Sequence, residues 1–284
     1  MRVIVTGGSG NVGRSVVGRL VDDGHEVTVY DRQAPAADVP HAIGDILDLP
    51  ALTKAFDGAE AVVHLAAVPA LGRAPDDELM ETNVMGTERV AAAAVANGVR
   101  RLVAASSDST LGFVFGEGRI VPDYLPCDEA HPARPLDAYG LSKVIDEEIC
   151  RRYTRAAGIE TVCLRYCWVW GAAEYAAVES FQAQPGNFIG QLWGYVDARD
   201  VAQAVAKSLT ATGIEHETLF ISAKRTFMRR PTLELVREYL PPGTEVRRPE
   251  RFSAEPNLCL LDCARAERVI GYRPEYDWEA VREA

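Results

Sequence analysis

Three residues of the chain have the types and spacing needed to take a proton from an alcohol. Tyr139 and Lys143 are four positions apart, so on a helix their side chains lie on the same face. A lysine ammonium beside a phenol favours the phenolate, which predicts a lowered tyrosine pKa and a working general base. Ser107, at the end of a neighbouring apolar segment, is placed to hydrogen-bond the same substrate oxygen. The Tyr-Lys spacing alone is also typical of an exposed helix pair, so its meaning depends on the elements around it.

The beginning of the chain predicts a strand, a glycine-rich turn and a helix. Residues 2–6 are mostly β-branched and apolar, residues 7–13 read Gly-Gly-Ser-Gly-Asn-Val-Gly, and apolar residues then recur at helical spacing. Gly7 permits the tight turn, Gly10 lets the backbone approach a pyrophosphate, and Gly13 lets the helix lie close to the strand. The N-terminus of such a helix offers free N–H groups and a positive dipole end to phosphates. The pattern therefore predicts a dinucleotide-binding unit.

An acidic residue stands where this unit needs one. Asp31 ends a second predicted strand, residues 26–30, and follows Gly13 by eighteen residues. Its carboxylate would accept hydrogen bonds from the adenosine ribose and repel a 2′-phosphate, which favours NAD. Arg32 could attract a 2′-phosphate, so NADP stays as an alternative. The other expected cofactor contacts lie at the helix N-terminus and after the next two strands: Asn11, Val12, Asp45, Ile46, Leu65, Ala66 and Ala67. A helix cap is the alternative role for Asp45.

Composition limits the classes of protein to which the chain can belong. It has 284 residues, 48% of them hydrophobic, and a net charge of -11, which argues against nucleic-acid and anionic membrane partners. The first strand follows Met1 directly, so we expect no signal peptide and a cytoplasmic location. Six scattered cysteines and five histidines form no metal-ligand pattern, so we expect free thiols and no metal site.

Strand and helix patterns alternate along the chain, which predicts an α/β fold with a doubly wound, mostly parallel sheet. We expect a long helix from about residue 76 to 96, a strand over 101–107, and a helix that carries Tyr139 to about residue 157. The predicted NAD(P)-binding Rossmann domain comprises residues 1–165 and about 196–225. A small substrate-binding lobe would comprise about 166–195 and 226–284, with a helix over 262–270 that Asp262 caps.

In this order the motifs resemble the extended short-chain dehydrogenase/reductase family, the NAD-dependent epimerase/dehydratase group that acts mostly on sugars. The resemblance covers nearly the whole chain. Its matching residues are Thr6 to Gly13, Asp31, Gly44 and Asp45, His64 to Ala67, Thr82 to Thr87, Ser106 and Ser107 with Gly112, Tyr139 to Lys143, Leu164 to Tyr166, and Tyr195 to Asp200. The resemblance implies a bound NAD(P) whose ribose Lys143 holds, and a homodimer through the two long helices. It also implies that Asn83 has a structural or cofactor-side role and that Tyr166 lies near the nicotinamide.

The departures from the family pattern bear on the substrate. Where relatives that handle nucleotide-sugars usually have asparagine after the Arg-Tyr-Phe motif, this chain has Trp168. Only about thirty residues separate Arg165 from Tyr195, which leaves little room for a nucleotide. The chain therefore predicts a smaller substrate. Asp108 follows Ser107, but the glutamate that a dehydratase needs next is absent, which disfavours elimination.

Uronate dehydrogenases, compact members of the family, are a serious comparison because their substrate lobe is equally short. They grip a carboxylate with a serine and an arginine. Here Pro69 takes the serine position, and no arginine occurs between Arg165 and Arg199, so only Arg73 or Arg229 could replace it. Aromatic residues in this region, Trp168 and Trp193 among them, could stack on a sugar ring or belong to the core.

Two further functions remain open beside a redox enzyme. One is a non-catalytic NAD(P)-binding sensor, because the fold can retain dinucleotide without turnover. The other is a structural or interaction protein, which would leave the glycine motif unexplained. An intact set of Ser107, Tyr139 and Lys143 favours the enzyme, with a small polar molecule as its substrate. Between a net dehydrogenase and an epimerase with transient oxidation the sequence does not decide.

Overall fold

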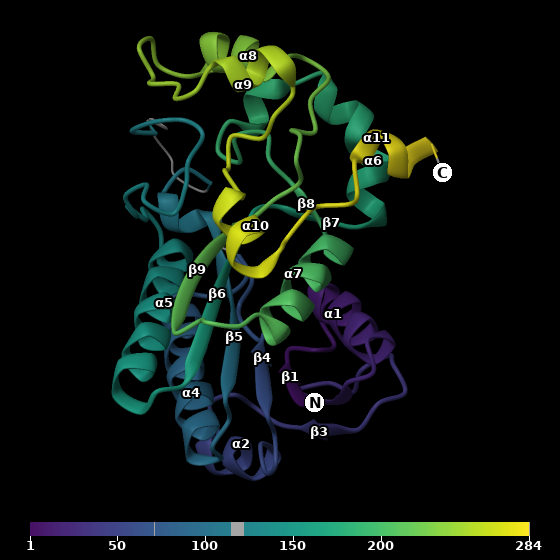
Figure 1. Cartoon of the computed structure of the whole chain (residues 1–284), viewed down its shortest axis with the longest axis vertical. Coiled ribbons are helices and arrows are strands. Elements are labelled where there is room, and N and C mark those ends of the chain that lie inside the picture. Colours follow the sequence, from purple (N-terminus) through teal and green to yellow (C-terminus); the bar gives the residue numbers. More distant parts are fainter. Residues whose placement is uncertain (71, 115–121, 284) are drawn as a thin grey trace.

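The computed structural model of the chain describes residues 1–70, 72–114 and 122–283. Within them, seven strands form one sheet in which every neighbouring pair is parallel, as expected (Figure 1). The order is β3-β2-β1-β4-β5-β6-β9. The strands are β1 (Arg2–Thr6), β2 (Glu26–Asp31), β3 (His41–Ile43), β4 (Ala61–His64), β5 (Arg101–Ser107), β6 (Glu160–Tyr166) and β9 (His216–Ile221). The order reverses between β1 and β4, and ligands bind at such a switch point beyond the carboxyl ends of the strands.

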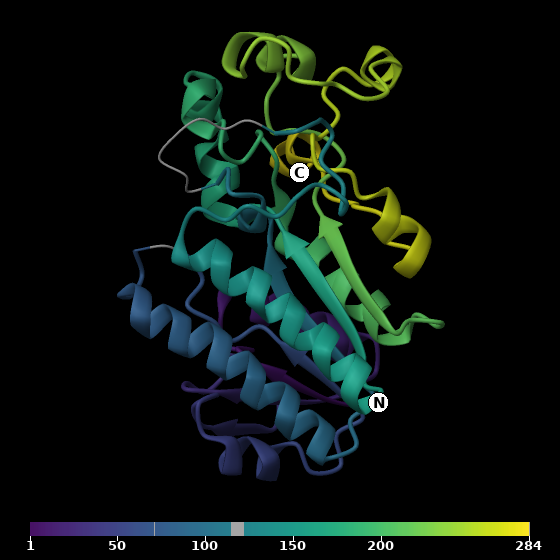
Figure 2. The same cartoon turned by 90° about the vertical axis from the view of Figure 1, so that its left-hand side faces the viewer.

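Helices cover both faces of this sheet. On one face α1 (Asn11–Asp22) packs against α7 (Ala198–Thr210), and on the other lie α2 (Leu49–Ala55), α4 (Gly86–Ala96) and α5 (Ala138–Ala157). Figure 2 shows α4 and α5 side by side along the outer face. Because successive strand residues point to opposite faces, Val63 joins one buried cluster and Val62 the other. Both faces are apolar because both are covered.

The predicted long helix before β5 follows one helical path with a wide turn in its middle. It consists of α3 (Asp76–Met80), the π-helical turn η1 (Glu81–Met85) and α4, which ends at Gly98 in the left-handed conformation. Asn83 lies in the wide turn and is only 1% exposed. Single π turns of this kind are frequent at functional sites.

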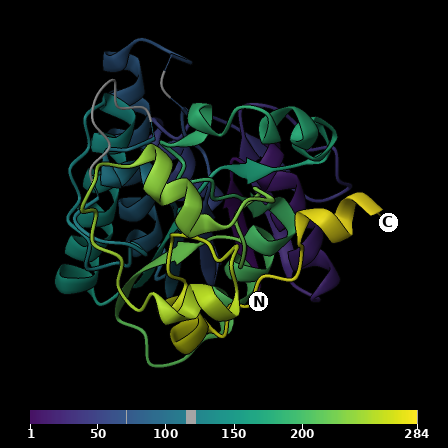
Figure 3. The ribbon, with the colours of Figure 1, turned by 90° about the horizontal axis from the view of Figure 1, so that it is seen from above.

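The segments after β6 and β9 lie largely above the carboxyl ends of the strands (Figures 1 and 3). They contain a small parallel sheet of β7 (Val169–Trp170) and β8 (Val196–Asp197) and the short 3₁₀ turn η3 (Pro185–Phe188). Their helices are α6 (Ala172–Gln182), α8 (Thr232–Tyr239), α9 (Glu250–Ala254), α10 (Ala264–Ile270) and α11 (Trp278–Glu283). Helix α10 returns to pack against β9 and α7. The domain division proposed from the sequence stays a prediction.

Two element boundaries differ from the sequence prediction. Strand β3 ends at Ile43, so Asp45 lies in the loop beyond it and does not end the strand. Helix α10 begins at Ala264 with Cys263 at its N-cap, although the Asp262 carboxylate still accepts the Ala264 N–H at 3.0 Å. No helix within the described residues is long and apolar enough to span a membrane.

Candidate active site

The glycine-rich turn joins β1 to α1 in the geometry that the sequence predicts. Gly7 has φ +74°, and a Cβ there would stand 2.5 Å from the Ala66 nitrogen, so only glycine fits. A Cβ on Gly13 would stand 2.3 Å from the Gly7 oxygen, because the helix begins against the turn. A Cβ on Gly10 would meet nothing closer than 3.4 Å. Packing therefore requires glycine at the first and last positions, whereas Gly10 leaves the backbone open on its outer side.

A cavity of about 380 Å³ lies in front of this turn. All of the expected adenosine and pyrophosphate contacts line it, namely Gly7, Gly10, Asn11, Val12, Gly13, Asp31, Arg32, Asp45, Ile46, Leu65, Ala66 and Ala67. Six other lining residues were not predicted as cofactor contacts: Ser9, Tyr30, Gln33, Gly44, Pro69 and Thr82. Of these, Ser9, Tyr30, Gln33 and Gly44 are direct neighbours of predicted contacts. The cavity thus joins residues from the carboxyl ends of several strands.

Asp31 stands at the wall of the cavity and fixes the turn. Its carboxylate accepts the Ser9 N–H at 3.0 Å and the Gln33 N–H at 3.2 Å. Carboxylate oxygens have further lone pairs, so Asp31 can still accept hydroxyl donors. Arg32 lines the same cavity, while the Arg14 side chain donates to the Ser9 carbonyl at 3.2 Å and braces the turn.

These residues fit a dinucleotide. Helix α1 has no side-chain cap, since its N-cap is Gly10, so its first N–H groups are left for a ligand. A helix N-terminus with uncapped donors and a positive dipole end favours a pyrophosphate. The acceptor Asp31 lies across the same cavity, where a ribose needs it.

Asn83 links the cofactor side to the catalytic helix. Its Oδ1 accepts the Val68 N–H at 2.8 Å, and its Nδ2 donates to the Val68 carbonyl at 3.2 Å and to Ser142 Oγ at 3.0 Å. The Ser142 hydroxyl in turn donates to the Tyr139 carbonyl at 2.7 Å. These contacts show the structural role that was one of the two expected for Asn83.

The three predicted catalytic residues converge at the carboxyl end of β5. Tyr139 lies in the first turn of α5, whose N-terminus the Asp137 side chain caps at the Gly140 N–H. The Ser107 hydroxyl interacts with the Tyr139 side chain, and Lys143 Nζ lies 5.9 Å from the centre of the Tyr139 ring. All three are at least nine-tenths buried. The exposed helix pair, which was the alternative reading of the spacing, is wrong.

The electrostatics of Tyr139 differ from the sequence prediction. Burial raises the pKa of Tyr139, and the Lys143 ammonium and the Ser107 hydroxyl oppose that rise without cancelling it. The lysine thus acts in the predicted direction, but the net pKa is raised because the phenol has lost its water. The resting side chain is therefore a neutral phenol that can donate a proton.

A buried carboxylate that the sequence did not single out accompanies the lysine. Lys143 Nζ donates to Asp146 Oδ2 at 3.1 Å and to the Ala105 carbonyl at 3.2 Å. Burial alone would lower the pKa of Lys143, but Asp146 and Tyr139 outweigh it, and the pKa is raised. Lys143 is therefore kept as an ammonium. The spacing of three residues on a helix could have indicated the pair.

Asp108 is the second carboxyl group near this centre. It lies in the short 3₁₀ turn η2 (Asp108–Leu111), is 6% exposed, and accepts the Ser107 hydroxyl at 3.2 Å. Burial raises its pKa to about 7, against the opposing effect of the Ser107 hydrogen bond. A carboxyl group with this pKa can exchange a proton near neutral pH.

Comparison with known proteins agrees with this geometry. The family model described as the NAD dependent epimerase/dehydratase family matches residues 3–221. The chain belongs to this family. L-arabinose 1-dehydrogenase (NAD(P)(+)) of Haloferax volcanii is 33% identical over 220 residues, which cover 74% of this chain and 83% of that protein. UDP-glucose 4-epimerase of Corynebacterium glutamicum is 27% identical over 309 residues, which cover 97% and 92%.

A solved structure has the same architecture. A short-chain dehydrogenase/reductase superfamily protein from Agrobacterium tumefaciens, with bound NAD, aligns with a TM-score of 0.76 and 25% identity and covers 100% of this chain and 95% of that one. The family resemblance seen in the sequence is thus confirmed, as are the Rossmann-type sheet and NAD(P) as the cofactor class. The protein is an NAD(P)-dependent oxidoreductase or epimerase of the extended short-chain dehydrogenase/reductase type.

A cluster of aromatic rings lies in the segment after β6, where the sequence predicts the substrate lobe. Trp168 is half-buried, stacks on Phe188 with ring centres 5.8 Å apart and meets Trp170 edge-on at 5.5 Å. Trp193 is completely buried, and its Nε1 donates to the Pro185 carbonyl at 2.9 Å. Trp193 therefore belongs to the core in this structure, which corrects its expected role as a substrate contact.

Tyr166 lies beside Ser107 in the sheet register, as a residue near the reacting end must. It is 7% exposed, and its hydroxyl has no hydrogen-bond partner within the described residues. Burial raises the pKa of Tyr166, so the hydroxyl is a neutral donor. An unpaired buried hydroxyl is costly unless a ligand meets it.

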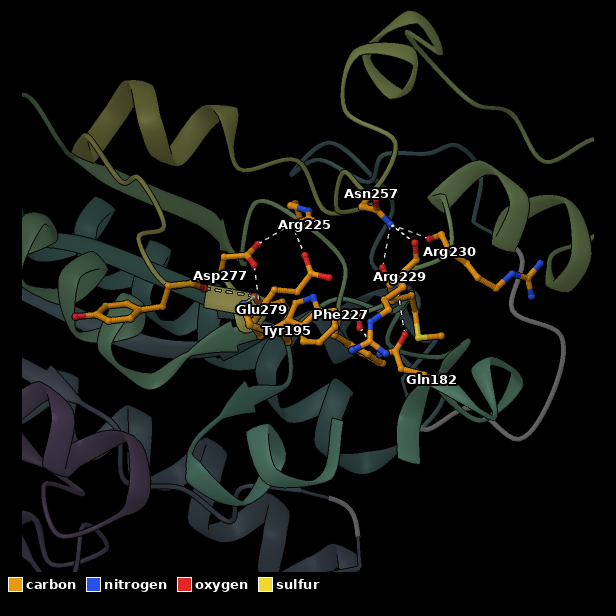
Figure 4. Close-up of polar contacts among 12 residues, drawn as sticks. Gln182, Tyr195, Arg225, Phe227, Arg229, Arg230, Asn257, Asp277 and Glu279 are labelled. Atoms are coloured by element: carbon orange, nitrogen blue, oxygen red, sulfur yellow. Dashed lines mark hydrogen bonds and ion pairs between the residues drawn. The ribbon is translucent and has the colours of Figure 1, made fainter. Parts of the chain in front are cut away.

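The two arginines that could have gripped a carboxylate lie elsewhere. Arg229 forms a surface ion pair with Glu179 at 2.7 Å, and its N–H donates to the Gln182 side chain at 3.0 Å (Figure 4). Arg73 is exposed in the loop before α3. The structure therefore gives Arg229 a partner outside the catalytic centre.

Polar contacts hold the lobe together around these rings. Figure 4 shows Arg225 between Asp277 and Glu279, at 3.4 and 3.0 Å. The Asn257 side chain donates to the backbone oxygens of residues 228–230. These bonds join the segment after β9 to the C-terminal segments. Among the rings of the cluster, Trp168, Phe181 and Phe188 are partly exposed.

Proposed function

We propose that the protein is an NAD-dependent dehydrogenase that removes a hydride from a carbinol carbon and a proton from its hydroxyl group, in a small sugar or a similarly small polar substrate. The observation that carries the proposal is the convergence of Ser107, Tyr139 and Lys143 at the carboxyl end of β5. This strand is the neighbour of β4, and the residues after β4 line the cofactor cavity. The sugar dehydrogenase relative and the short segment between β6 and β8 support a small substrate over a nucleotide-sugar.

In this proposal each residue has one task. Tyr139 accepts the hydroxyl proton during oxidation and returns it during reduction, while the Ser107 hydroxyl orients the substrate oxygen. Lys143 stabilises the phenolate and binds the nicotinamide ribose. A bound NAD would supply the hydride acceptor for the carbon that carries this hydroxyl. Tyr166 and Trp168 would contact the nicotinamide and the substrate, and Asp108 would take part on the substrate side.

The raised pKa of Tyr139 gives the reaction a pH dependence. Oxidation requires the phenolate, so its rate should rise with pH until Tyr139 is deprotonated. Reduction requires the phenol, so its rate should fall over the same range. At neutral pH the Tyr139 phenol is therefore ready to donate a proton, and alkaline conditions favour oxidation.

The first experiment is a spectroscopic assay for reduced nicotinamide with NAD or NADP and a panel of aldoses, uronic acids, nucleotide-sugars and small secondary alcohols. Tyr139→Phe should fold and bind cofactor but lose about 10²- to 10⁴-fold in turnover, the usual contribution of a general acid/base. Near-normal turnover of Tyr139→Phe would show that the catalytic assignment is wrong.

An epimerase is the second candidate, because the epimerase relative matches 97% of the chain. Cofactor that stays bound through purification, with no net reduction on any substrate, would favour it. Oxidation of a uronate has less support, since Arg229, one of the two arginines that could bind its carboxylate, is paired with Glu179 on the surface. A sensor without turnover would have no need for a buried Tyr139 and Lys143.

The homodimer stays a prediction. Met85 and Leu141, on η1 and α5, are 42% and 43% exposed, as apolar residues at an interface between two chains would be. The mass in solution, measured by light scattering, tests it.

A further inference from the structure

The carboxylate of Asp146 lies against the lysine that the proposed reaction needs. Asp146 follows Lys143 by three residues on α5, so the two side chains share a face of the helix. Their side chains are 4% and 5% exposed, and Oδ2 stands 3.1 Å from Nζ. The ion pair itself lies within one helix, and the Thr87 side chain of α4 also interacts with the Asp146 carboxyl group. Its second oxygen, Oδ1, has no hydrogen-bond partner within the described residues.

Lys143 has one close counter-charge. The titratable groups that act on it or feel its charge come from three elements: Tyr139 and Asp146 on α5, Cys163 on β6 and His64 on β4. Glu147, on α5, and Asp108, in η2, act on Asp146 and Tyr139 in turn. Burial lowers the pKa of His64 to about 3, so that imidazole is neutral, and the Cys163 thiol is held protonated by its hydrogen bond with Cys150 and by burial. Asp146 is thus the close carboxylate that supports the ammonium.

A buried ammonium without a partner would give up its proton, because removing it from water is costly. Asp146 offsets this cost and fixes the position of Nζ between the Ala105 carbonyl and Tyr139. The same negative charge disfavours the Tyr139 phenolate. Asp146 therefore acts on both groups. It keeps Lys143 protonated, which favours the reaction, and it disfavours deprotonation of Tyr139, which opposes it.

We propose that Asp146 is a positioning residue that holds the Lys143 ammonium for the nicotinamide ribose and sets how much of its charge reaches Tyr139. The inference rests on the proposed function, because it assigns Asp146 a role through Lys143 and Tyr139. A purely structural pair would leave the pH dependence of binding and turnover unchanged when its charge is removed at constant fold.

Asp146→Asn keeps the shape of the side chain and removes its charge. Oxidation needs Tyr139 deprotonated and Lys143 protonated, so these two groups set the acid and alkaline limbs of the pH profile. Without the carboxylate the phenolate is easier to form, so the acid limb moves to lower pH. The ammonium is also easier to deprotonate, so the alkaline limb moves to lower pH as well. Both limbs move in the same direction.

The test measures NAD affinity by titration calorimetry and kcat/KM for oxidation, both between about pH 6 and pH 10. The variants are Asp146→Asn, the smaller Asp146→Ser, the charge-preserving Asp146→Glu, and Glu148→Gln as a matched control on the exposed face of α5. At the alkaline end Asp146→Asn should bind NAD about tenfold or more weakly than the wild type, as when a charged hydrogen-bond donor is lost. At the acid end its relative kcat/KM should exceed that of the wild type. Asp146→Glu and Glu148→Gln should keep the wild-type profile.

Two results overturn the inference. One is a folded Asp146→Asn with wild-type NAD affinity and pH limbs. The other is failure of both uncharged variants to fold while Asp146→Glu folds, which would make Asp146 a structural residue. Tyr139→Phe separates the two proposals. If that variant turns over normally, the proposed function fails, whereas the NAD-binding arm still decides the role of Asp146.

Discussion

Helix α5 carries two buried ion pairs whose acidic members, Asp146 and Glu147, are consecutive residues in different surroundings. Glu147 receives both ends of the Arg165 guanidinium at 2.8 Å and the Ser106 hydroxyl at 2.6 Å, so both of its oxygens are used. These contacts join α5 to β5 and β6. Asp146 receives one ammonium within its own helix, at 3.1 Å.

The difference is what we expect between a pair that holds the fold and a pair that has the role proposed above. A bidentate arginine fork fixes distance and angle, which suits a permanent link between a helix and two strands. A lysine with one carboxylate contact keeps free donors for a ligand. Both pairs are buried on the same helix, so burial alone does not distinguish them. They differ in the number of hydrogen bonds that each carboxylate accepts.

Arg165→Met should break the structural pair and have the largest effect on folding. The Glu147 charge would remain buried without its cation, a change that typically costs about 3–5 kcal/mol of unfolding free energy. Urea unfolding followed by circular dichroism measures the loss. The double variant Glu147→Gln/Arg165→Met should recover most of it, because no unpaired charge is left. Unchanged stability with lost NAD binding would reverse the roles of the two pairs.

Asp108→Asn tests a buried carboxyl group that no cation supports among the described residues. Its folded pKa of about 7 lies above the ordinary aspartate value of 3.8, so the folded state binds the proton more tightly. Its contribution to stability is therefore present below about pH 4 and lost as pH rises through about 7. The asparagine variant stays neutral, so it should exceed the wild type by up to about 4 kcal/mol above pH 7 and by little near pH 4.

Thermal or urea unfolding of both proteins at several pH values measures this difference. Because other groups titrate equally in both, the variant-minus-wild-type curve isolates Asp108. A difference that does not change with pH would show that folding does not raise the pKa of Asp108.

Glu148→Gln should have the smallest effect. Glu148 is half-exposed on α5 and pairs with Arg151 and Arg155, which are also exposed. Such surface pairs contribute about 0.5 kcal/mol or less and are screened by salt. Urea unfolding at low and high salt measures the change. A loss comparable with that of Arg165→Met would mean that burial is not what distinguishes the pairs of this helix.

Much of the cofactor side could be predicted from the sequence, because its geometry is local. The φ of Gly7 and the contact of Gly13 with the turn follow from a few neighbouring residues. Asp31 ends the strand that comes next after the glycine-rich turn and its helix, so its position is local as well. The expected adenosine and pyrophosphate contacts line one cavity. The strand over 101–107 and the helix that carries Tyr139 were found from periodicity within a residue or two.

The substrate side and the electrostatics could not be predicted in this way. Whether Trp193 faces a pocket or the core depends on Pro185, whose carbonyl accepts its Nε1, and on the Tyr239 ring of α8. The pKa of Tyr139 depends on how completely the surrounding elements exclude water, because burial raises it. The spacing to Lys143 indicated only the opposing effect, by which the ammonium lowers this pKa.

The sequence by itself determined the cofactor class and the parallel sheet, and it singled out Ser107, Tyr139 and Lys143, which the fold brings together. Each depends on short-range spacing and on the period of apolar residues. Only the tertiary structure decided that Tyr139 is a neutral phenol. It also decided that Asp146 forms an ion pair with Lys143 and that Arg229 forms one with Glu179. Burial and pairing are properties of groups brought together from distant segments. Their free energies depend on water excluded by the whole fold, which no local pattern encodes.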